Sequence, residues 1–300
     1  MIRRSLPTFA VAAVSLALVN APAAKAASQT LDKIKEVGKI SFGYREASIP
    51  FAYLGADQKP TGLSLELCSA VADKIRSELR RPELAAEYVA VNASNRIPLL
   101  QNGTIDIECG STTNTAERQK QVSFTVATYV ASPRWLVSAS SAITEPNALE
   151  GQTIVVTQGS LNAALVQKMI ADHKLTANIV QAKDHAESLL MLKTGRATAW
   201  FEDDILVAGQ VANSPDSKLF RMLAKTYEPT YYGLMVPRED PEFKALVDSV
   251  IKQKMASGEF NTLYSKWFES PIPPKGDNLR LPMSDAMKAR VASPSDALTP

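Results

Sequence analysis

The chain has 300 residues, with 33 basic and 31 acidic side chains and a formal net charge of +2. This near balance excludes the strongly basic surface with which nucleic-acid-binding proteins neutralise phosphates. The length is enough for two lobes with a hydrophobic core each.

The first 26 residues are predicted to be a secretory signal peptide. Arg3 and Arg4 precede an apolar stretch at residues 6–19, and Ala24-Lys25-Ala26 fits an A-x-A cleavage site. The apolar stretch is shorter than the ~20 residues that span a bilayer, and no later segment approaches that length. We therefore expect a periplasmic protein, whose mature chain from residue 27 has a net charge of about −1.

Short apolar runs alternate with helical patterns in the first half of the chain. Predicted strands at residues 40–43, 88–91 and 105–108 are followed by predicted helices at residues 63–79, 96–101 and from 116 onward. Such a βα repeat is typical of a largely parallel sheet with helices on both faces.

A second series of the same kind starts at residue 153. The strand at residues 154–156 leads to a helix that Ser160 can cap and that runs to residue 170. A strand at 177–180 follows, and then a helix that ends at residue 195, with Asp184 and Glu187 as its capping box. A strand at 197–201 closes the series, which indicates a second α/β lobe.

Two extended apolar runs, at residues 129–137 and 231–236, are placed to connect the lobes. Helices at 241–255 and 259–268 would then complete the first lobe. We therefore predict an α/β fold with two lobes and two hinge crossings. The first lobe comprises residues 27–130 and 231–270, the second comprises residues 131–230, and residues 271–300 form an irregular C-terminal tail.

Two arginines are predicted at helix N-termini, where the helix dipole disfavours a cation unless an anion lies beside it. Asn114 and Glu117 fit a capping box that places Arg118 in the first turn. Asn95 is a candidate cap that places Arg96 in the same position. A solvated surface arginine is the alternative interpretation of each, so the anion-binding hypothesis depends on several such sites converging.

The two cysteines, Cys68 and Cys109, have neither CxxC spacing nor a pair of histidines to suggest a metal site. Two buried or half-buried thiols are the expected state, and a disulfide between them is the alternative in an oxidising compartment. A catalytic pair of Cys109 and His185 is less favoured, because nothing in the sequence brings them together. No motif for a cofactor or a P-loop is present.

Several runs of the chain match a known family. They are Gly43–Glu46, Asn95–Thr104, Glu108–Asn114, Glu117–Gln121, Ala182–His185, Lys266–Phe268 and Pro271–Lys275. In these runs the chain closely resembles the periplasmic glutamate/aspartate-binding proteins of ABC importers, within the polar-amino-acid solute-binding family. The resemblance covers nearly the whole mature chain and implies a two-lobe α/β fold that closes on its ligand.

The resemblance also implies a role for each residue of the binding site. Arg118 would hold the ligand's α-carboxylate together with Ser111 and Thr113, and Asp203 would hold its α-ammonium group. Arg45, Arg96 and His185 would hold the side-chain carboxylate, to which a cationic imidazole would bind better than a neutral one. Without the resemblance, Asp203 is equally a helix N-cap and His185 an exposed first-turn residue.

The chain departs from the close relatives at two positions of the implied site. Ala93 stands where they have a serine, and Leu161 where they have a threonine. Each change removes a hydroxyl donor, which costs about 0.5–1.5 kcal/mol for one neutral hydrogen bond. Ser94 and Ser160 are candidates to replace these donors. The preference among glutamate, aspartate and glutamine therefore stays open.

The predicted function is a monomeric binding protein without cofactor or metal that delivers acidic amino acids to the membrane permease of an ABC importer. One alternative is an exported enzyme on the same fold, such as a dehydratase, with His185 or Glu202 as acid or base. A second is a binding protein for glutamine or another dicarboxylate. A third is a module that reports to a membrane receptor.

Overall fold

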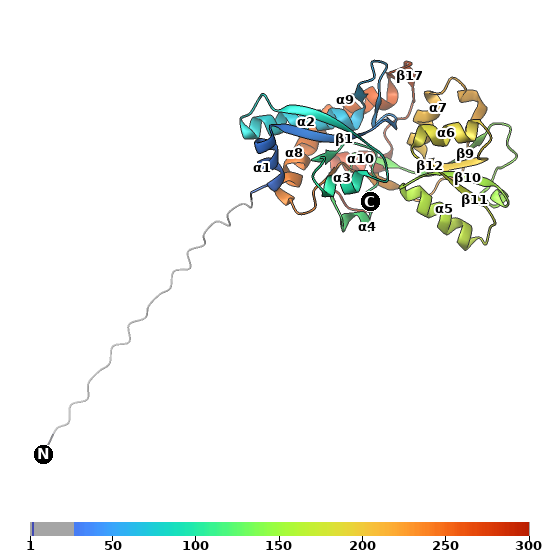
Figure 1. The fold of residues 1–300 in the computed structure, drawn as a ribbon, viewed down its shortest axis with the longest axis horizontal. Coiled ribbons are helices and arrows are strands. Elements are labelled where there is room, and N and C mark those ends of the chain that lie inside the picture. The colour runs from blue at the N-terminus through green and yellow to red at the C-terminus, as the bar shows by residue number, and fades with distance from the viewer. Residues whose placement is uncertain (1, 3–26, 300) are drawn as a thin grey trace.

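The computed structural model describes residue 2 and residues 27–299. Apart from residue 2, the predicted signal peptide lies outside this described part. The described residues fold into two α/β lobes, each built on a five-stranded sheet, which lie end to end along the long axis (Figure 1). Among these residues, no helix has both the length and the apolar character needed to cross a membrane.

The first lobe contains a sheet with the strand order β5-β1-β6-β15-β7. β1 is parallel to β5 and β6, as the βα repeat predicts, whereas β15 is antiparallel to β6 and β7. The helices predicted at residues 63–79 and 96–101 are confirmed with those bounds. The elements of this lobe are α1 (Gln29–Val37), β1 (Lys39–Arg45), α2 (Leu63–Leu79), β5 (Ala85–Val91), α3 (Arg96–Gln101), β6 (Ile107–Glu108), α4 (Ala116–Gln119), β7 (Ser123–Phe124), β15 (Met235–Val236), α8 (Pro241–Ser257) and α9 (Glu259–Tyr264), with a three-stranded sheet of β2 (Ala47–Ser48), β3 (Ala52–Leu54) and β4 (Pro60–Thr61).

The second lobe contains a sheet with the strand order β11-β10-β12-β9-β13, in which β10 is parallel to β11 and β12. The Ser160 hydroxyl accepts from the Ala163 N–H and caps α5, and the Asp184 carboxylate accepts from the Glu187 N–H and caps α6, so both predicted caps are confirmed. The elements of this lobe are β9 (Pro133–Ser138), η1 (Pro146–Leu149), β10 (Thr153–Thr157), α5 (Leu161–Asp172), β11 (Asn178–Ala182), α6 (His185–Lys193), β12 (Ala199–Asp203), α7 (Asp204–Ala212), η2 (Ser217–Leu219) and β13 (Phe220–Met222).

The chain crosses between the lobes along two paired strands. β8 (Tyr129–Ala131) and β14 (Thr230–Tyr232) are antiparallel, with Tyr129 opposite Tyr232. β8 leads into β9 of the second lobe, and β14 leads back to β15 of the first. The predicted two hinge crossings are therefore present, although the extended run at residues 129–137 is divided into two strands.

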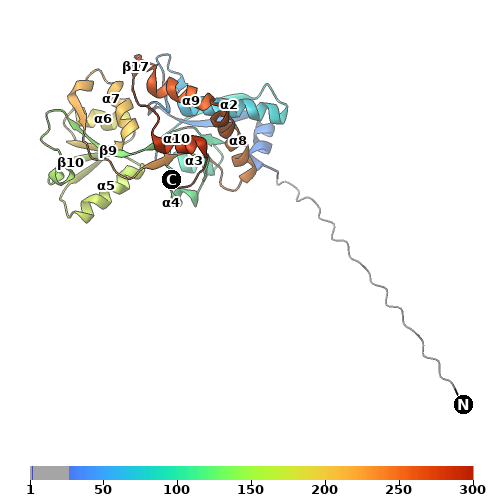
Figure 2. The same ribbon diagram turned by 180° about the vertical axis from the view of Figure 1, so that it is seen from behind.

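The C-terminal tail is more ordered than predicted. It forms β16 (Pro271–Ile272), β17 (Asp277–Asn278) and a capped helix, α10 (Asp285–Ala292), after the π-helical segment η3 (Ser265–Glu269). On α10, Met287 is buried and the Arg290 guanidinium lies 4.4 Å from the centre of the Tyr231 ring. Figure 2 shows α10 lying across the first lobe near the place where the lobes join. The prediction of an irregular tail is wrong, since α10 forms and packs against α8 and the hinge strand β8.

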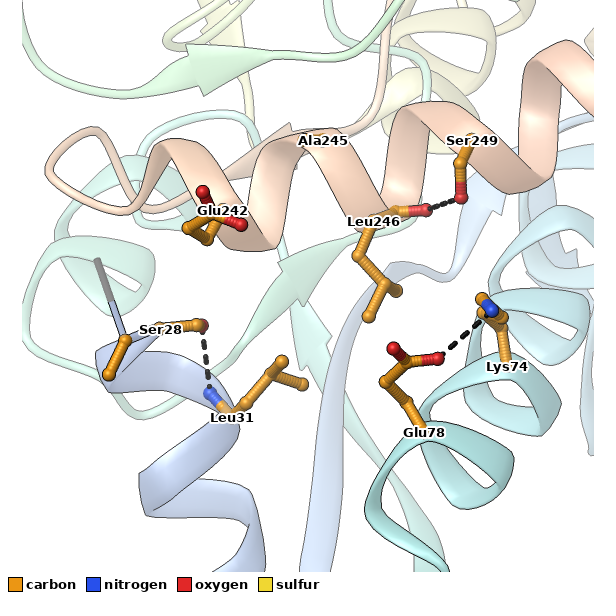
Figure 3. Close-up of a pocket in the computed structure, with 9 residues that line it drawn as sticks. Ser28, Leu31, Lys74, Glu78, Glu242, Ala245, Leu246 and Ser249 are labelled. Carbon is orange, nitrogen blue, oxygen red and sulfur yellow. Dashed lines mark hydrogen bonds and ion pairs between the residues drawn. The ribbon is translucent and has the colours of Figure 1, made fainter. Parts of the chain in front are cut away.

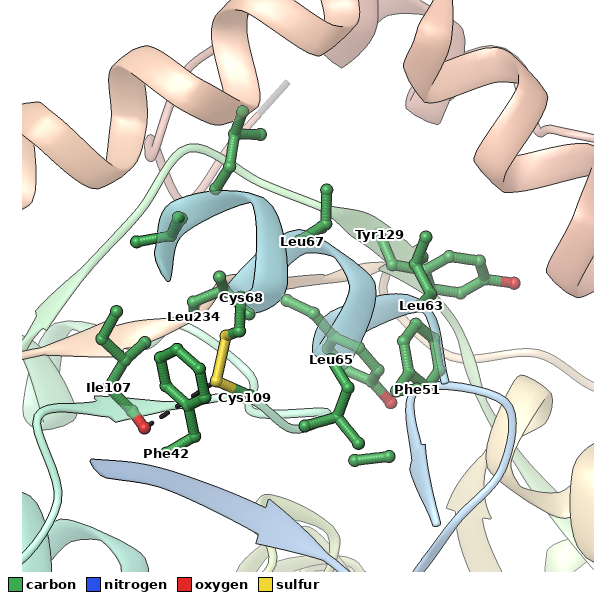
Figure 4. Packing of buried hydrophobic residues seen from close by; sticks show 14 of the residues in the cluster. Phe42, Phe51, Leu63, Leu65, Leu67, Cys68, Ile107, Cys109, Tyr129 and Leu234 are labelled. Carbon is green, nitrogen blue, oxygen red and sulfur yellow. Dashed lines mark hydrogen bonds between the residues drawn. A yellow bond between two sulfur atoms is a disulfide. The ribbon is translucent and has the colours of Figure 1, made fainter. Parts of the chain in front are cut away.

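A disulfide joins Cys68 on α2 to Cys109, the residue after β6 (Figure 4). Both lie in the apolar core of the first lobe, which also contains Phe42, Ile107 and Leu234. The two Cα atoms are 6.3 Å apart, within the range that a disulfide spans. The expectation of two free thiols is therefore wrong. Cys68 lies on the face of α2 that packs beside the end of β6. This contact joins distant parts of the chain, so the sequence pattern around either cysteine does not predict it.

Candidate ligand-binding site

All eight residues predicted to bind the ligand line one cavity between the two lobes. They are Arg45, Arg96, Ser111, Thr113, Arg118, Ser160, His185 and Asp203, and the same cavity is lined by Ala93, Leu161, Asn162, Glu202 and Leu206. The space left inside is about 10 Å³, which is room for about one water molecule. An amino acid can therefore enter only if the lobes move apart.

The three arginines reach the cavity from the ends of separate elements of the first lobe. Arg45 ends β1, Arg96 begins α3, and Arg118 lies in α4. Burial lowers the pKa of Arg45 to about 10 and that of Arg118 to about 9, and in both cases the nearby Arg96 cation adds to the fall. All three side chains stay cationic at neutral pH, so the cavity concentrates positive charge that favours an anion.

One of these arginines, Arg96, and the nearby Ser111 have polar atoms that a ligand can use. Arg118 donates from Nη1 to the Thr113 carbonyl at 2.8 Å and from Nη2 to the Gly159 carbonyl at 3.3 Å, which links the lobes. The Nε of Arg96 and the Ser111 hydroxyl are buried and have no hydrogen-bond partner within the described residues. Because an unpaired buried donor is costly, these atoms are suited to a bound carboxylate.

The predicted caps of the two arginine-bearing helices are not the ones that form. Thr115, and not Asn114, caps α4 by accepting from the Arg118 N–H, while the Asn114 amide donates to the Asp296 carbonyl. The Asn95 side chain accepts from the Asn92 N–H and does not cap α3. Both side-chain amides are used in other hydrogen bonds, with Asp296 for Asn114 and with Asn92 for Asn95, and the capping pattern does not predict these bonds.

Asp203 supplies a buried carboxylate at the end of β12. Its Oδ1 accepts from Asn162 Nδ2 at 3.2 Å, and its Oδ2 accepts a short hydrogen bond from the Tyr232 hydroxyl. Burial raises the pKa of Asp203 to about 6, and these two hydrogen bonds oppose the rise. Asp203 also stands at the N-cap position of α7, but its side chain makes no capping bond. The carboxylate is therefore directed to the cavity and the hinge.

His185 begins α6 and is only 2% exposed, so the interpretation as an exposed first-turn residue is wrong. Its Nδ1 lies 3.1 Å from the Ala47 carbonyl oxygen and 3.3 Å from the Ser48 hydroxyl, both in the first lobe. Burial lowers the pKa of His185 well below its ordinary value, and the nearby Arg45 cation adds to the fall. The ring is therefore neutral at pH 7, and the stronger binding of the side-chain carboxylate to a cationic imidazole stays a prediction.

Glu202 and Asn162 also line the cavity, and the sequence prediction did not assign them to the binding site. Adjacent strand residues point to opposite faces, so Glu202 is expected to point away from the side on which Asp203 lies. Instead, Glu202 Oε1 accepts from the Asp203 N–H at 3.1 Å and from the Asn162 amide. In the sequence, the acidic run Glu202-Asp203-Asp204 directly after the apolar residues of β12 is the signal that could have indicated this position.

The two departures from the relatives lie at the cavity wall, since Ala93 and Leu161 both line it. Of their candidate replacements, Ser160 lines the cavity, although its hydroxyl accepts the capping bond of α5. Ser94 is exposed and is not among the residues that line the cavity. Within the described residues, no group of three or more His, Cys, Asp or Glu side chains is placed to hold a metal ion.

A larger groove, of about 460 Å³, lies between α1, α2 and α8 (Figure 3). Its lining includes Lys74 and Glu78, which pair with each other at 3.0 Å one turn apart on α2, and Ser28, whose hydroxyl caps α1. These polar groups are satisfied by local structure and do not converge on a common point. The cavity between the lobes is therefore the candidate site.

The chain matches the family model of the bacterial extracellular solute-binding proteins, family 3, over residues 40–270. It is 45% identical to the L-glutamate/L-aspartate-binding protein of Pseudomonas aeruginosa, with 98% of each chain covered. It is 39% identical to the glutamate/aspartate import solute-binding protein of Escherichia coli, again with 98% of each chain covered.

Solved structures agree with the fold. A crystal structure of a mutant of ArgBP from T. maritima matches with a TM-score of 0.71 and 25% identity, over 80% of this chain and 100% of that one. The solute receptor for L-cysteine of Neisseria gonorrhoeae matches with a TM-score of 0.70 and 23% identity, over 80% and 93% of the two chains. The two-lobe architecture, the cavity between the lobes and the match over residues 40–270 lead to one conclusion: the chain belongs to the bacterial extracellular solute-binding proteins, family 3.

Proposed function

We propose that the protein captures an acidic L-amino acid, glutamate or aspartate, and delivers it to the membrane permease of an ABC importer. The observation that carries this proposal is a cavity lined by two buried arginines, the half-buried Arg118 and one buried aspartate. This set matches a ligand with two carboxylates and one ammonium group. The names of the relatives from P. aeruginosa and E. coli give the same ligand class.

Each end of the ligand has complementary groups in the cavity. Arg118, with Ser111 and Thr113, would hold the α-carboxylate, because a guanidinium offers two parallel donors to a carboxylate. Asp203 would hold the α-ammonium group through opposite charge. Arg45 and Arg96 would hold the side-chain carboxylate, and the neutral His185 ring would line the same end of the cavity, with its Nδ1 proton directed to the Ala47 carbonyl. Ser160 lines the wall beside Arg118.

Binding requires the lobes to open and close, because about 10 Å³ of free space cannot hold an amino acid. Polar contacts between the lobes must break for this opening, such as the bond from Arg118 to the Gly159 carbonyl. The strand pair β8 and β14 supplies the connection about which the lobes turn. We place the first lobe at residues 27–130 and 231–270, the second at 131–230 and the tail at 271–300.

Export through the signal peptide at residues 1–26 would bring the mature protein to the periplasm, where such a carrier meets its permease as a monomer. Mass spectrometry of the exported protein tests this part. A chain that starts near residue 27 is the expected result, and an uncleaved chain would contradict it.

A thermal-shift screen of the twenty amino acids and small dicarboxylates tests the ligand class. A ligand that binds only the native state at about 100 times its dissociation constant adds about 2.7 kcal/mol of stability. We expect the largest rise in melting temperature with L-glutamate or L-aspartate. A clear shift with a sugar or a cationic amino acid, and none with these two, would refute the proposal.

The alternative of an exported enzyme is separated from binding by the fate of the ligand. After prolonged incubation of the protein with glutamate or aspartate, mass spectrometry should recover the amino acid unchanged. Formation of a new product would support turnover. The relatives from P. aeruginosa and E. coli are named as binding proteins, which agrees with capture without chemistry.

A further inference from the structure

Glu202 is a buried acid whose two oxygens have different environments. The side chain is 1% exposed, at the end of β12. Oε1 accepts from the Asn162 amide and from the Asp203 N–H, whereas Oε2 is buried without a hydrogen-bond partner among the described residues. Because Glu202 lines the cavity, this unpaired oxygen is available to a group inside it.

The partner that faces Oε2 is the imidazole of His185, whose Nε2 lies 3.7 Å away. The Ala47 carbonyl can only accept, and it lies 3.1 Å from His185 Nδ1, so we assign the ring proton to Nδ1. Nε2 of the neutral ring then presents a lone pair toward Oε2. Two facing lone pairs in a buried site repel each other, and a proton on Glu202 removes the repulsion.

Charged and titratable groups face Glu202 from several elements of both lobes and from the hinge. They are Arg45 on β1, Arg96 on α3, His185 on α6, the neighbouring Asp203 on β12 and Tyr232 on β14, and the polar Thr157 on β10 and Asn162 on α5 contact it as well. Burial raises the pKa of Glu202 to about 7, the Asp203 carboxylate adds to the rise, and the hydrogen bonds from Asp203, Asn162 and Thr157 oppose it. The proton that the geometry requires is thus exchanged near neutral pH.

We propose that Glu202 is a specificity-determining residue, whose protonation sets the choice between a carboxylate and a carboxamide side chain in the bound amino acid. This inference rests on the proposed function, since it needs an amino acid in the cavity. When Glu202 is protonated, its O–H donates to the side-chain carboxylate of glutamate, because His185 Nε2 at 3.7 Å is too far away to accept a hydrogen bond. When Glu202 is ionised, it repels that carboxylate and accepts instead from the amide N–H of glutamine.

The two ligands therefore differ in their proton balance. Above the pKa of the free site, glutamate binding draws one proton from solvent onto Glu202, whereas glutamine binding draws none. The ratio of the glutamate affinity to the glutamine affinity should then fall by up to about tenfold for each pH unit above 7. Asp203 is proposed to hold the α-ammonium group, which both ligands have. Its titration therefore changes both affinities by the same factor and leaves their ratio unchanged.

The experiment is calorimetric titration of the wild-type protein with L-glutamate and L-glutamine from pH 5.5 to 8.5. A parallel set at pH 7.5, in two buffers of different ionisation enthalpy, counts the protons taken up. We expect net uptake of up to one proton with glutamate and a smaller uptake with glutamine, together with the falling ratio. This measurement needs no variant, so it does not depend on a substituted protein folding.

Two substitutions sharpen the test. Glu202→Gln keeps the shape and cannot titrate, so its affinity ratio should not change with pH. Glu46→Gln is the matched control, because Glu46 is an exposed acid at the mouth outside the cavity, and it should keep the wild-type slope.

The outcomes separate the inference from the proposed function. If glutamate binds but the wild-type ratio is flat and proton uptake is equal for the two ligands, the role of Glu202 is wrong and the acidic-ligand proposal stands. If the slope persists in Glu202→Gln, another group carries the proton and the inference is overturned. If neither amino acid binds at any pH, both proposals fail.

Discussion

Gly209 on α7 of the second lobe packs directly against the main chain of Ile49 in the first lobe. A Cβ at Gly209 would overlap the Ile49 carbonyl oxygen and stand 2.9 Å from the carbonyl carbon. Gly159 makes a similar approach, since its Cβ would stand 2.7 Å from the Ser94 nitrogen. Two glycines of the second lobe thus permit the close approach of the lobes that encloses the cavity.

We expect Gly209→Ala to weaken ligand binding by disfavouring the closed form. Alanine is better than glycine in a helix by up to about 1 kcal/mol, so α7 itself should not suffer. Overpacking against Ile49 costs about 1–3 kcal/mol, equivalent to a loss of about 5- to 150-fold in affinity for glutamate. Calorimetry measures the loss, and small-angle scattering should show a larger radius of gyration at saturating ligand.

Gly258→Ala is the matched control for closure. Gly258 has a φ of +82°, and no atom lies within 4 Å of the point where a Cβ would stand, so alanine strains the backbone without meeting a neighbour. This variant should lose stability and keep its affinity for glutamate. Unchanged affinity in Gly209→Ala would show that the contact with Ile49 does not limit closure.

The arginines should have separable roles. Arg118→Ala should abolish binding of every α-amino acid, because an enclosed α-carboxylate without its partner costs on the order of 3–5 kcal/mol. Arg45→Ala and Arg96→Ala should penalise glutamate more than glutamine, because these side chains are assigned to the side-chain end. Arg238→Ala is the control, since Arg238 is a half-exposed arginine paired with its neighbour Glu239. Calorimetry with both ligands decides, and equal losses in all three site variants would remove this division of roles.

The placement of the site could be predicted because it depends on local signals in the sequence. Ser160 and Asp184 cap helices where the pattern indicates, and β1 and α3 have Arg45 and Arg96 at the ends that meet the cavity. These caps and strand ends are encoded within a few residues and are present in the folded chain, whereas the predicted caps Asn114 and Asn95 are not. The resemblance to a known family supplied the further prediction that these residues, from both lobes, meet at one binding site.

The parts that could not be predicted depend on contacts between distant segments. The Cys68–Cys109 bridge requires α2 to lie beside the end of β6, and α10 packs against α8 and β8, which are far from it in the sequence. Glu202 enters the cavity because its side chain folds back onto the Asp203 N–H. Neither hydrophobic periodicity nor capping patterns report such tertiary contacts.

Loss of the disulfide should lower the stability of the first lobe. The bridge closes a loop with a sequence separation of 41, for which the chain-entropy relation gives about 4 kcal/mol. Cys68→Ala should therefore shift the midpoint of urea denaturation to lower urea, and reductant should shift the wild-type midpoint in the same direction. Reductant should not change the midpoint of Cys68→Ala further. A wild-type midpoint insensitive to both changes would contradict a stabilising bridge.

The affinity for glutamate should depend on pH on the acid side through Asp203, which must be ionised to hold the α-ammonium group. Burial raises the pKa of Asp203 to about 6, and a bound ammonium favours the ionised form. Binding below pH 6 therefore releases a proton, and the affinity should rise with pH up to about 6, before proton uptake at Glu202 lowers it above pH 7. The hydrogen bond from Tyr232 stabilises the carboxylate, so Tyr232→Phe should move this rise to higher pH.

Tyr231→Phe is the matched control, because Tyr231 packs beneath Arg290 instead and a phenyl ring keeps that contact. Calorimetric titrations between pH 5 and 6.5 measure the three curves. If the Tyr232→Phe and Tyr231→Phe curves coincide with the wild type, the Tyr232 hydroxyl does not tune Asp203, and the acid limb must come from another group.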